Sequence, residues 1–215
     1  MLKDHSPQRR QMRELIAQTA ARMIAEDGIQ DYALAKRKAA RQLGAADTHS
    51  LPSNGEVQQA LRLHQGLYQK DEQPLRLKQL RTEALAAMHL LERFNPYLTG
   101  SVLTGTATRH SDINLQLFTD NAKEVELFLL NRNMPYETGE KRSRLNDDMF
   151  SVPTFTLQSE TSEIRLAVFS TEDLRKSSYD PIEGKPLERA KTKQLEILLA
   201  ANPYPDNESP AFAGK

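Results

Sequence analysis

The chain has 215 residues, 38% of them hydrophobic, and its 29 basic residues balance its 29 acidic ones. This length is enough for one domain with an added helical part, and the charge balance gives no overall preference for nucleic acid or a membrane. The absence of cysteine excludes disulfides and thiolate metal sites. The opening MLKDHSPQRR has no apolar signal core, and no run of about 18 apolar residues occurs. We therefore expect a soluble, cytoplasmic protein.

Apolar residues recur at helical spacing in four segments before the first expected strand. Ser6 and Pro7 are suited to begin the first helix, and Asp31 is suited to cap the second. Ser53 and Glu56 have the spacing of a capping box at the start of the third. The predicted helices cover residues 7–28, 32–43, 54–70 and 74–94. These segments predict an N-terminal helical bundle.

The stretch 99–120, TGSVLTGTATRHSDINLQLFTD, joins a turn of small residues to a strand with an unusual polar face. Gly100, Ser101 and Gly105 leave the backbone free to adopt positive φ and give a polyanion room to approach. In the strand that comes next, apolar and polar residues alternate, so Asp112 and Asn114 share one face. The sequence therefore predicts a phosphate-binding turn beside a strand that presents two oxygen ligands.

These residues resemble the DNA polymerase β-like nucleotidyltransferase superfamily, whose minimal members carry G-S-x3-G-x5-S-D-x-D on a turn followed by a strand. In this chain the pattern falls on Gly100, Ser101, Gly105, Ser111, Asp112 and Asn114. The spacing matches, but Asn114 stands where the family has its second carboxylate. The resemblance covers this stretch closely and residues 97–170 in pattern.

The resemblance implies two magnesium ions, held by two carboxylates on this strand and a third on a later one, which bind a nucleoside triphosphate and activate a hydroxyl. It implies that Asp112 is a metal ligand and that Asn114 is a weaker oxygen ligand beside it. The nucleotide-binding residues it implies are Gly100, Ser101, Gly105, Ser111 and Arg165. His110, in the loop before Asp112, is a further candidate for a phosphate contact.

The third acidic position falls on a strand expected at 163–169, where Glu163 and Arg165 share the polar face. Glu163 there would complete a magnesium site. Arg165 would instead form a cross-strand ion pair with Asp112 and cancel the negative charge that magnesium needs. Both alternatives remain open, with Asn114 a hydrogen-bonding neighbour in the second.

The other expected elements surround this strand. Asp120 is predicted to cap a helix, Pro153 indicates an edge strand, and Lys141, Arg142 and Arg144 are expected in a charged hairpin loop. The predicted segments are helices at 121–131 and 187–200, strands at 134–138, 150–158 and 163–169, and a short helical turn at 171–176.

Together these features predict an α+β fold: an N-terminal helical bundle, a small mixed β-sheet domain of nucleotidyltransferase type and a C-terminal helix. The expected boundaries are 1–95, 96–176, 177–201 and a disordered tail at 202–215. The expected function is nucleoside triphosphate binding with magnesium-dependent nucleotidyl transfer to a hydroxyl or phosphate. The alternative is an inactive descendant of the fold that binds a nucleotide, an RNA or a protein partner.

A lesser alternative comes from residues 1–44, whose run AARMIAEDG is similar to the first helices of TetR-type repressors. That similarity implies a DNA-binding regulator. After Gly44, however, the chain continues as AADTHSLPSNG, which is typical of a loop, where such a regulator has its recognition helix. We expect the N-terminal helices to dock on the sheet domain instead of binding DNA.

Overall fold

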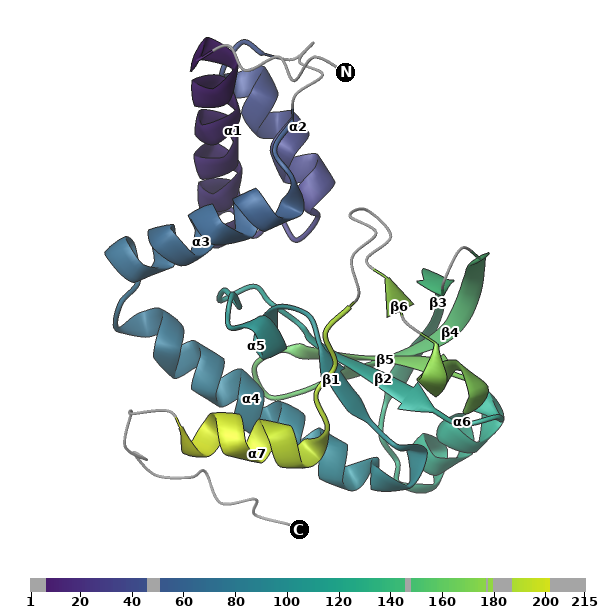
Figure 1. Ribbon diagram of the computed structural model, residues 1–215. Helices are drawn as coiled ribbons and strands as arrows, with labels where there is room; N and C mark the ends of the chain where they lie inside the picture. Colours follow the sequence, from purple (N-terminus) through teal and green to yellow (C-terminus); the bar gives the residue numbers. More distant parts are fainter. Residues whose placement is uncertain (1–6, 46–50, 146–147, 177, 180–186, 202–215) are drawn as a thin grey trace.

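A computed structural model describes residues 7–45, 51–145, 148–176, 178–179 and 187–201. Figure 1 shows a helical unit of α1, α2 and α3 standing over a sheet, with further helices beneath it. The α+β class, the N-terminal helices and the C-terminal helix are as predicted. The predicted tail lies outside the described residues. Within the described ranges, no helix combines the length and apolar character needed to cross a membrane.

The helical unit consists of α1 (Pro7–Glu26), α2 (Tyr32–Gln42) and α3 (Asn54–Tyr68), which enclose a hydrophobic core of their own. The predicted start signals of α2 and α3 are present, and Pro7 begins α1, whereas Ser6 lies outside the described residues. The carboxylate of Asp31 accepts from the N–H groups of Ala33 and Leu34, and Ser53 and Glu56 form the capping box. Local side-chain chemistry therefore fixes where α2 and α3 begin.

The fourth helix, α4 (Glu72–Leu90), belongs to a different core from the first three. Its buried residues Leu80, Ala84 and Met88 pack with the sheet, whereas the buried residues of α1–α3 form a separate cluster. A short 3-10 helix, η1 (Glu92–Phe94), comes directly after it. The four helices expected within 1–95 are thus present, but they contribute to two cores.

The sheet has six strands among the described residues, in the order β1-β2-β5-β4-β3-β6. Neighbouring strands are antiparallel except β2 and β5, which are parallel. Their bounds are β1 (Tyr97–Thr99), β2 (Ile113–Phe118), β3 (Tyr136–Leu145), β4 (Asp148–Gln158), β5 (Glu163–Phe169) and β6 (Ser178–Tyr179). The parallel pairing of β2 with β5 brings the two predicted polar segments side by side.

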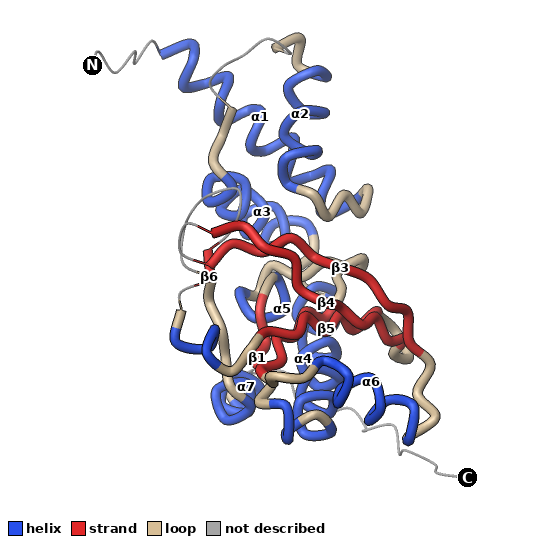
Figure 2. The backbone as a smooth tube through the Cα atoms, turned by 90° about the vertical axis from the view of Figure 1, so that its right-hand side faces the viewer, coloured by secondary structure: helices blue, strands red, loops and turns tan. Residues whose placement is uncertain are grey.

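The register of β2 and β5 confirms the alternation expected from the sequence. Their six core residues are all buried in one cluster and pair as Ile113 with Ile164, Leu115 with Leu166, and Leu117 with Val168. Helices α4, α6 (Ala122–Asn131) and α7 (Thr192–Ala200) add residues to the same cluster and lie together along one side of the sheet (Figure 2). The polar residues of both strands therefore share the opposite face.

Two strand predictions need correction. Strand β4 lies between β5 and β3 and is not an edge strand, although its pairing with β5 stops at Thr154, so Pro153 has a strand neighbour on the β3 side alone. Strand β3 runs to Leu145 and includes Lys141 and Arg142, which were expected in a loop. Pairing with β4 along its whole length holds this charged segment extended.

Two helix boundaries also differ from expectation. The cap of α6 is Asn121, whose side chain accepts from the N–H of Lys123; Asp120 instead accepts from the backbone N–H and hydroxyl of Thr171. Helix α7 begins at Thr192 and not near residue 187. Ala190 forms a bridge to Leu98 of β1, and this extended pairing prevents an earlier helix start.

Candidate functional site

The small-residue turn connects β1 to a single-turn helix, α5 (Ser101–Thr104). Gly100 and Gly105 flank this helix with φ of 76° and 81°, so both occupy the backbone region that favours glycine. A Cβ placed on Gly100 would lie 3.6 Å from Nδ2 of Asn114. The fold therefore places the turn directly against the polar face of β2.

Two serines of the motif, ten positions apart, meet behind this turn. The hydroxyl of Ser101 donates to Oγ of Ser111 at 3.3 Å, and the backbone N–H of Thr108 donates to the same oxygen at 2.9 Å. Arg81 of α4 reaches the turn from the other side and donates to the carbonyls of Val102 and Leu103, both at 3.1 Å. These bonds hold the turn and the adjoining loop in a defined shape.

Arg165 contacts both acidic side chains of the predicted site. Its Nη2 lies 2.8 Å from Oδ2 of Asp112 and 3.0 Å from Oε2 of Glu163. The Asp112 contact is a charge pair without a well-aligned hydrogen bond, since Oδ2 is buried and no donor is directed at it. The hydrogen bond from Arg165 is the main cause that lowers the pKa of Glu163 below its usual range. Of the two alternatives left open, the structure contains the ion pair.

Asn114 lies beside this pair, opposite Arg165 in the strand register. Its Nδ2 donates to the backbone carbonyl of Asp112 at 3.3 Å. The described residues contain no group of three histidine, cysteine, aspartate or glutamate side chains that could hold a metal ion. With a guanidinium between the two carboxylates, the residues at the start of β2 and β5 do not fit a magnesium site.

A cavity of about 400 Å³ opens at these strand starts. It includes Ser111, Asp112, Glu163 and Arg165 from the predicted set, together with His110. The other lining residues come from α4, the α1–α2 connection, the loop before β2, the end of β4 and the β4–β5 turn: Gln30, Arg76, Arg109, Gln158, Ser159, Glu160, Thr161 and Ser162. The predicted Gly100, Ser101, Gly105 and Asn114 are outside this lining. The structure therefore divides the predicted site between the turn and the cavity.

The arginines that line the cavity differ in how many of their N–H donors already have a partner in the protein. Arg76 is held by the β4–β5 turn, donating to the hydroxyl of Thr161 at 2.7 Å and to its carbonyl at 2.8 Å. Arg165 makes both of its carboxylate contacts through Nη2, and its Nε and Nη1 have no partner within the described ranges. Arg165 is also half-exposed. It retains donors that can bind an anion.

Towards the end of β2, aromatic residues cover the face that alternation predicts to be polar. Tyr97, Phe118 and Phe169 form a buried cluster there, with the rings of Phe118 and Phe169 stacked at 5.6 Å. Gln116 is only 5% exposed beneath it. This cluster confines the accessible polar site to the first residues of β2 and β5.

Sequence reasoning missed Gln30, Arg76 and Arg109 as parts of this site. Arg109 is only three residues before Asp112, so the sequence already indicates that it lies near the site. Gln30 and Arg76 reach the cavity from distant segments, and no local pattern marks them. A search against protein-family models gives no match for this chain, and a search of curated proteins gives none either.

Proposed function

We propose that this protein binds a nucleoside triphosphate through its phosphates, on a nucleotidyltransferase-like fold, and does not carry out magnesium-dependent transfer. The observation that carries the proposal is the position of Arg165 between Asp112 and Glu163, at 2.8 and 3.0 Å. Its positive charge stands at one of the two positions, 163 and 165, where the resemblance places the third carboxylate.

The physical argument rests on what each ligand requires. Magnesium needs concentrated negative charge, and a guanidinium in contact with two carboxylates removes most of it. Phosphate oxygens, in contrast, are bound well by the planar fork of arginine. Arg165 keeps Nε and Nη1 for such bonds, and Arg76 and Arg109 line the same cavity. The lining balances these three arginines with three carboxylates, those of Asp112, Glu160 and Glu163. What the cavity offers an anion is therefore the unused arginine donors, without needing a metal.

The resemblance adds the role of the turn. Gly100 and Gly105 adopt positive φ, and Gly100 lies against Asn114. This arrangement supports a role for the turn and for Ser101 in contacting the phosphates of the nucleotide. The absence of cysteine is consistent with the reducing cytoplasm, where nucleoside triphosphates are abundant. We therefore assign the proposed function to that compartment.

Thermal unfolding with ATP in the presence of EDTA tests this proposal. ATP at about 100 times its dissociation constant should stabilise the protein by about 2.7 kcal/mol, which raises the melting temperature by a few degrees. Arg165→Gln should lose most of this shift. Arg37→Gln, at an exposed position on α2, should keep it. No shift with ATP, with or without magnesium, would overturn nucleotide binding.

Magnesium-dependent transfer is the competing interpretation that the resemblance implies, with Asp112, Asn114 and Glu163 as the oxygen ligands, but Arg165 lies between the two carboxylates. Isothermal titration separates the candidates. We expect weak or no magnesium binding by the unmodified chain, and stronger binding by the double variant Asn114→Asp with Arg165→Asp, which restores acids on the shared face. Tight binding by the unmodified chain that Asp112→Ala abolishes would favour an active transferase.

A further inference from the structure

The helical unit contacts the sheet domain through one polar face of α3. Gln58, Arg62 and Gln65 succeed each other at helical spacing on this face. Gln58 donates to the hydroxyl of Thr104 at 3.2 Å, and Arg62 to its carbonyl at 3.2 Å. Gln65, which is only 4% exposed, donates to the carbonyl of Ala107 at 3.1 Å. These bonds hold the segment that connects the small-residue turn to the cavity.

The end of α1 makes a second set of contacts, directly at the cavity. Arg109 donates through Nη2 to the carbonyl of Glu26 at 3.0 Å, and Gln30 donates to the carbonyl of His110 at 2.7 Å. Gly28, at φ of 72°, packs so closely that a Cβ on it would lie 2.9 Å from the His110 ring. Gln30, Arg109 and His110 all line the cavity.

These contacts join two units whose hydrophobic cores are separate. The buried clusters of α1–α3 and of the sheet have no residue in common. An individual hydrogen bond contributes only about 1 kcal/mol net, because water competes for the same groups. Among the described residues, hydrogen bonds and the Gly28–His110 contact join the two units without a shared hydrophobic core. We therefore expect docking to be weaker than the packing within either core.

We propose that the helical unit forms the second half of the binding site, with Gln30 and the end of α1 positioning Arg109 and His110 for a bound phosphate. This inference rests on the proposed nucleotide binding. Docking of the helical unit holds Arg109 and His110 at the cavity, and a ligand that binds them favours the docked arrangement. Because only the docked arrangement completes the site, the apparent affinity for the ligand falls in proportion to the fraction of the protein that is docked.

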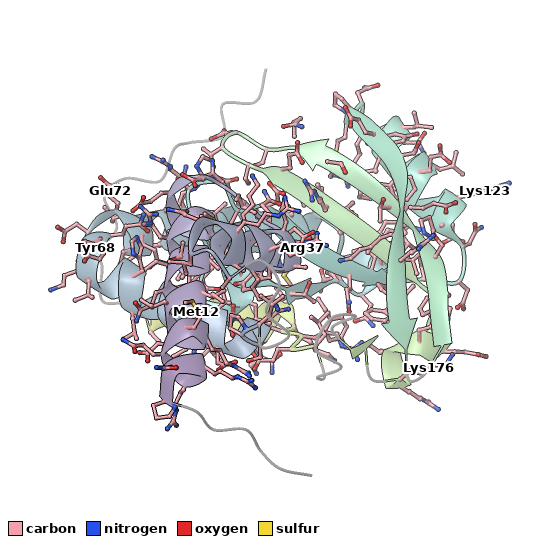
Figure 3. The ribbon with its side chains drawn as sticks, turned by 90° about the horizontal axis from the view of Figure 1, so that it is seen from above. Met12, Arg37, Tyr68, Glu72, Lys123 and Lys176 are labelled. Carbon is pink, nitrogen blue, oxygen red and sulfur yellow. The ribbon has the colours of Figure 1, made fainter. Side chains whose placement is uncertain are left out.

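The lack of native cysteine allows this to be measured with two introduced labels. Arg37 on the helical unit and Lys123 on α6 are both exposed, and they lie on different parts of the molecule (Figure 3). In the Arg37→Cys, Lys123→Cys protein carrying a donor and an acceptor dye, ATP should shift the energy-transfer distribution towards a single docked population. ATP affinity is measured on the same sample by isothermal titration.

The positioning role is tested by Gln58→Ala with Gln65→Ala, because neither glutamine lines the cavity. This double variant should broaden the energy-transfer distribution without ATP, recover the docked population with ATP, and bind ATP about tenfold more weakly. Gln59→Ala is the matched control: it changes the same residue type on the exposed side of α3 and should leave both readouts unchanged.

The outcomes separate the two proposals. If ATP binds but neither the energy-transfer distribution nor the affinity responds to ATP or to the double variant, the helical unit is not part of the site, while nucleotide binding stands. A double variant that lowers only the melting temperature, with unchanged ATP affinity, also overturns the positioning role. If ATP does not bind the unmodified chain, both proposals fail.

Discussion

The two hydrophobic cores are built from different residues. Among the described residues, alanine supplies seven of the eleven buried positions in the core of α1–α3, but only three of the twenty in the core of the sheet domain. The sheet core instead contains leucine, isoleucine, valine and phenylalanine from strands and helices. Small side chains let helices approach closely, but each one removes little apolar surface from water.

This difference sets what each region can do alone. The sheet domain buries large side chains between β2, β5 and three helices and has the means for stability of its own. The helical unit relies on close contacts of alanines and on polar docking to the loop at 104–107. We expect it to unfold first, in a transition separate from that of the sheet domain.

The largest effect is expected from Leu166→Ala in the sheet core. Leu166 is fully buried on β5, between Leu115 of β2 and Phe155 of β4. Its truncation leaves a cavity and should reduce the stability of the sheet transition by about 4 kcal/mol. Urea unfolding followed by far-UV circular dichroism measures this loss. The transition of the helical unit should not move, and Leu127→Ala, at a position 56% exposed, should have little effect.

A smaller loss of stability is expected from Ala20→Leu in the core of α1–α3. Ala20 is fully buried in the core of α1–α3, where the added side chain has no space. Overpacking should lower the stability of the helical transition by about 2 kcal/mol and leave the sheet transition unchanged. Gln18→Leu, at an exposed position on the same helix, is the control. One transition that both variants shift equally would show that the two cores unfold together.

The same contrast explains how far the sequence could predict the fold. Alternation in β2 and β5 depends on residues within one segment, and the predicted shared face agrees with the structure. The helix caps at Asp31 and Ser53 likewise depend only on residues that are close in the sequence. Periodicity identified the apolar face of α4 but not its partner. Whether Leu80 and Met88 pack on helices or on a sheet depends on the path of the whole chain.

The candidate site was predicted where the motif is contiguous and missed where it is not. The sequence placed Asp112 and Arg165 on neighbouring polar faces and offered their ion pair as one of two alternatives, and the structure contains that pair. The cavity also includes Gln30 from the α1–α2 connection and Arg76 from α4, and neither segment has a visible link to the motif. Polar contacts between distant segments leave no periodic trace in a sequence.

The smallest predicted effect concerns the ion pair between Arg13 of α1 and Glu56 of α3. Two hydrogen bonds, at 2.8 and 2.6 Å, join the side chains, and the bond from Arg13 is the main cause that lowers the pKa of Glu56 from 4.5 to about 2. A carboxyl whose pKa is lower in the folded state adds stability above its unfolded pKa and loses it as pH falls. The contribution is therefore complete above about pH 4.5 and disappears towards pH 2.

Glu56→Gln isolates this charge, because glutamine can still accept from the N–H of Ser53 and keep the capping box. Both partners are more than 40% exposed, so solvent screening limits the expected loss to about 1 kcal/mol at neutral pH. The loss should appear in the helical transition alone, shrink at high salt, and vanish near pH 2. Unfolding followed at several pH values measures this. An equal loss at neutral pH and at pH 2 would mean that the change acts through packing and not through the ion pair.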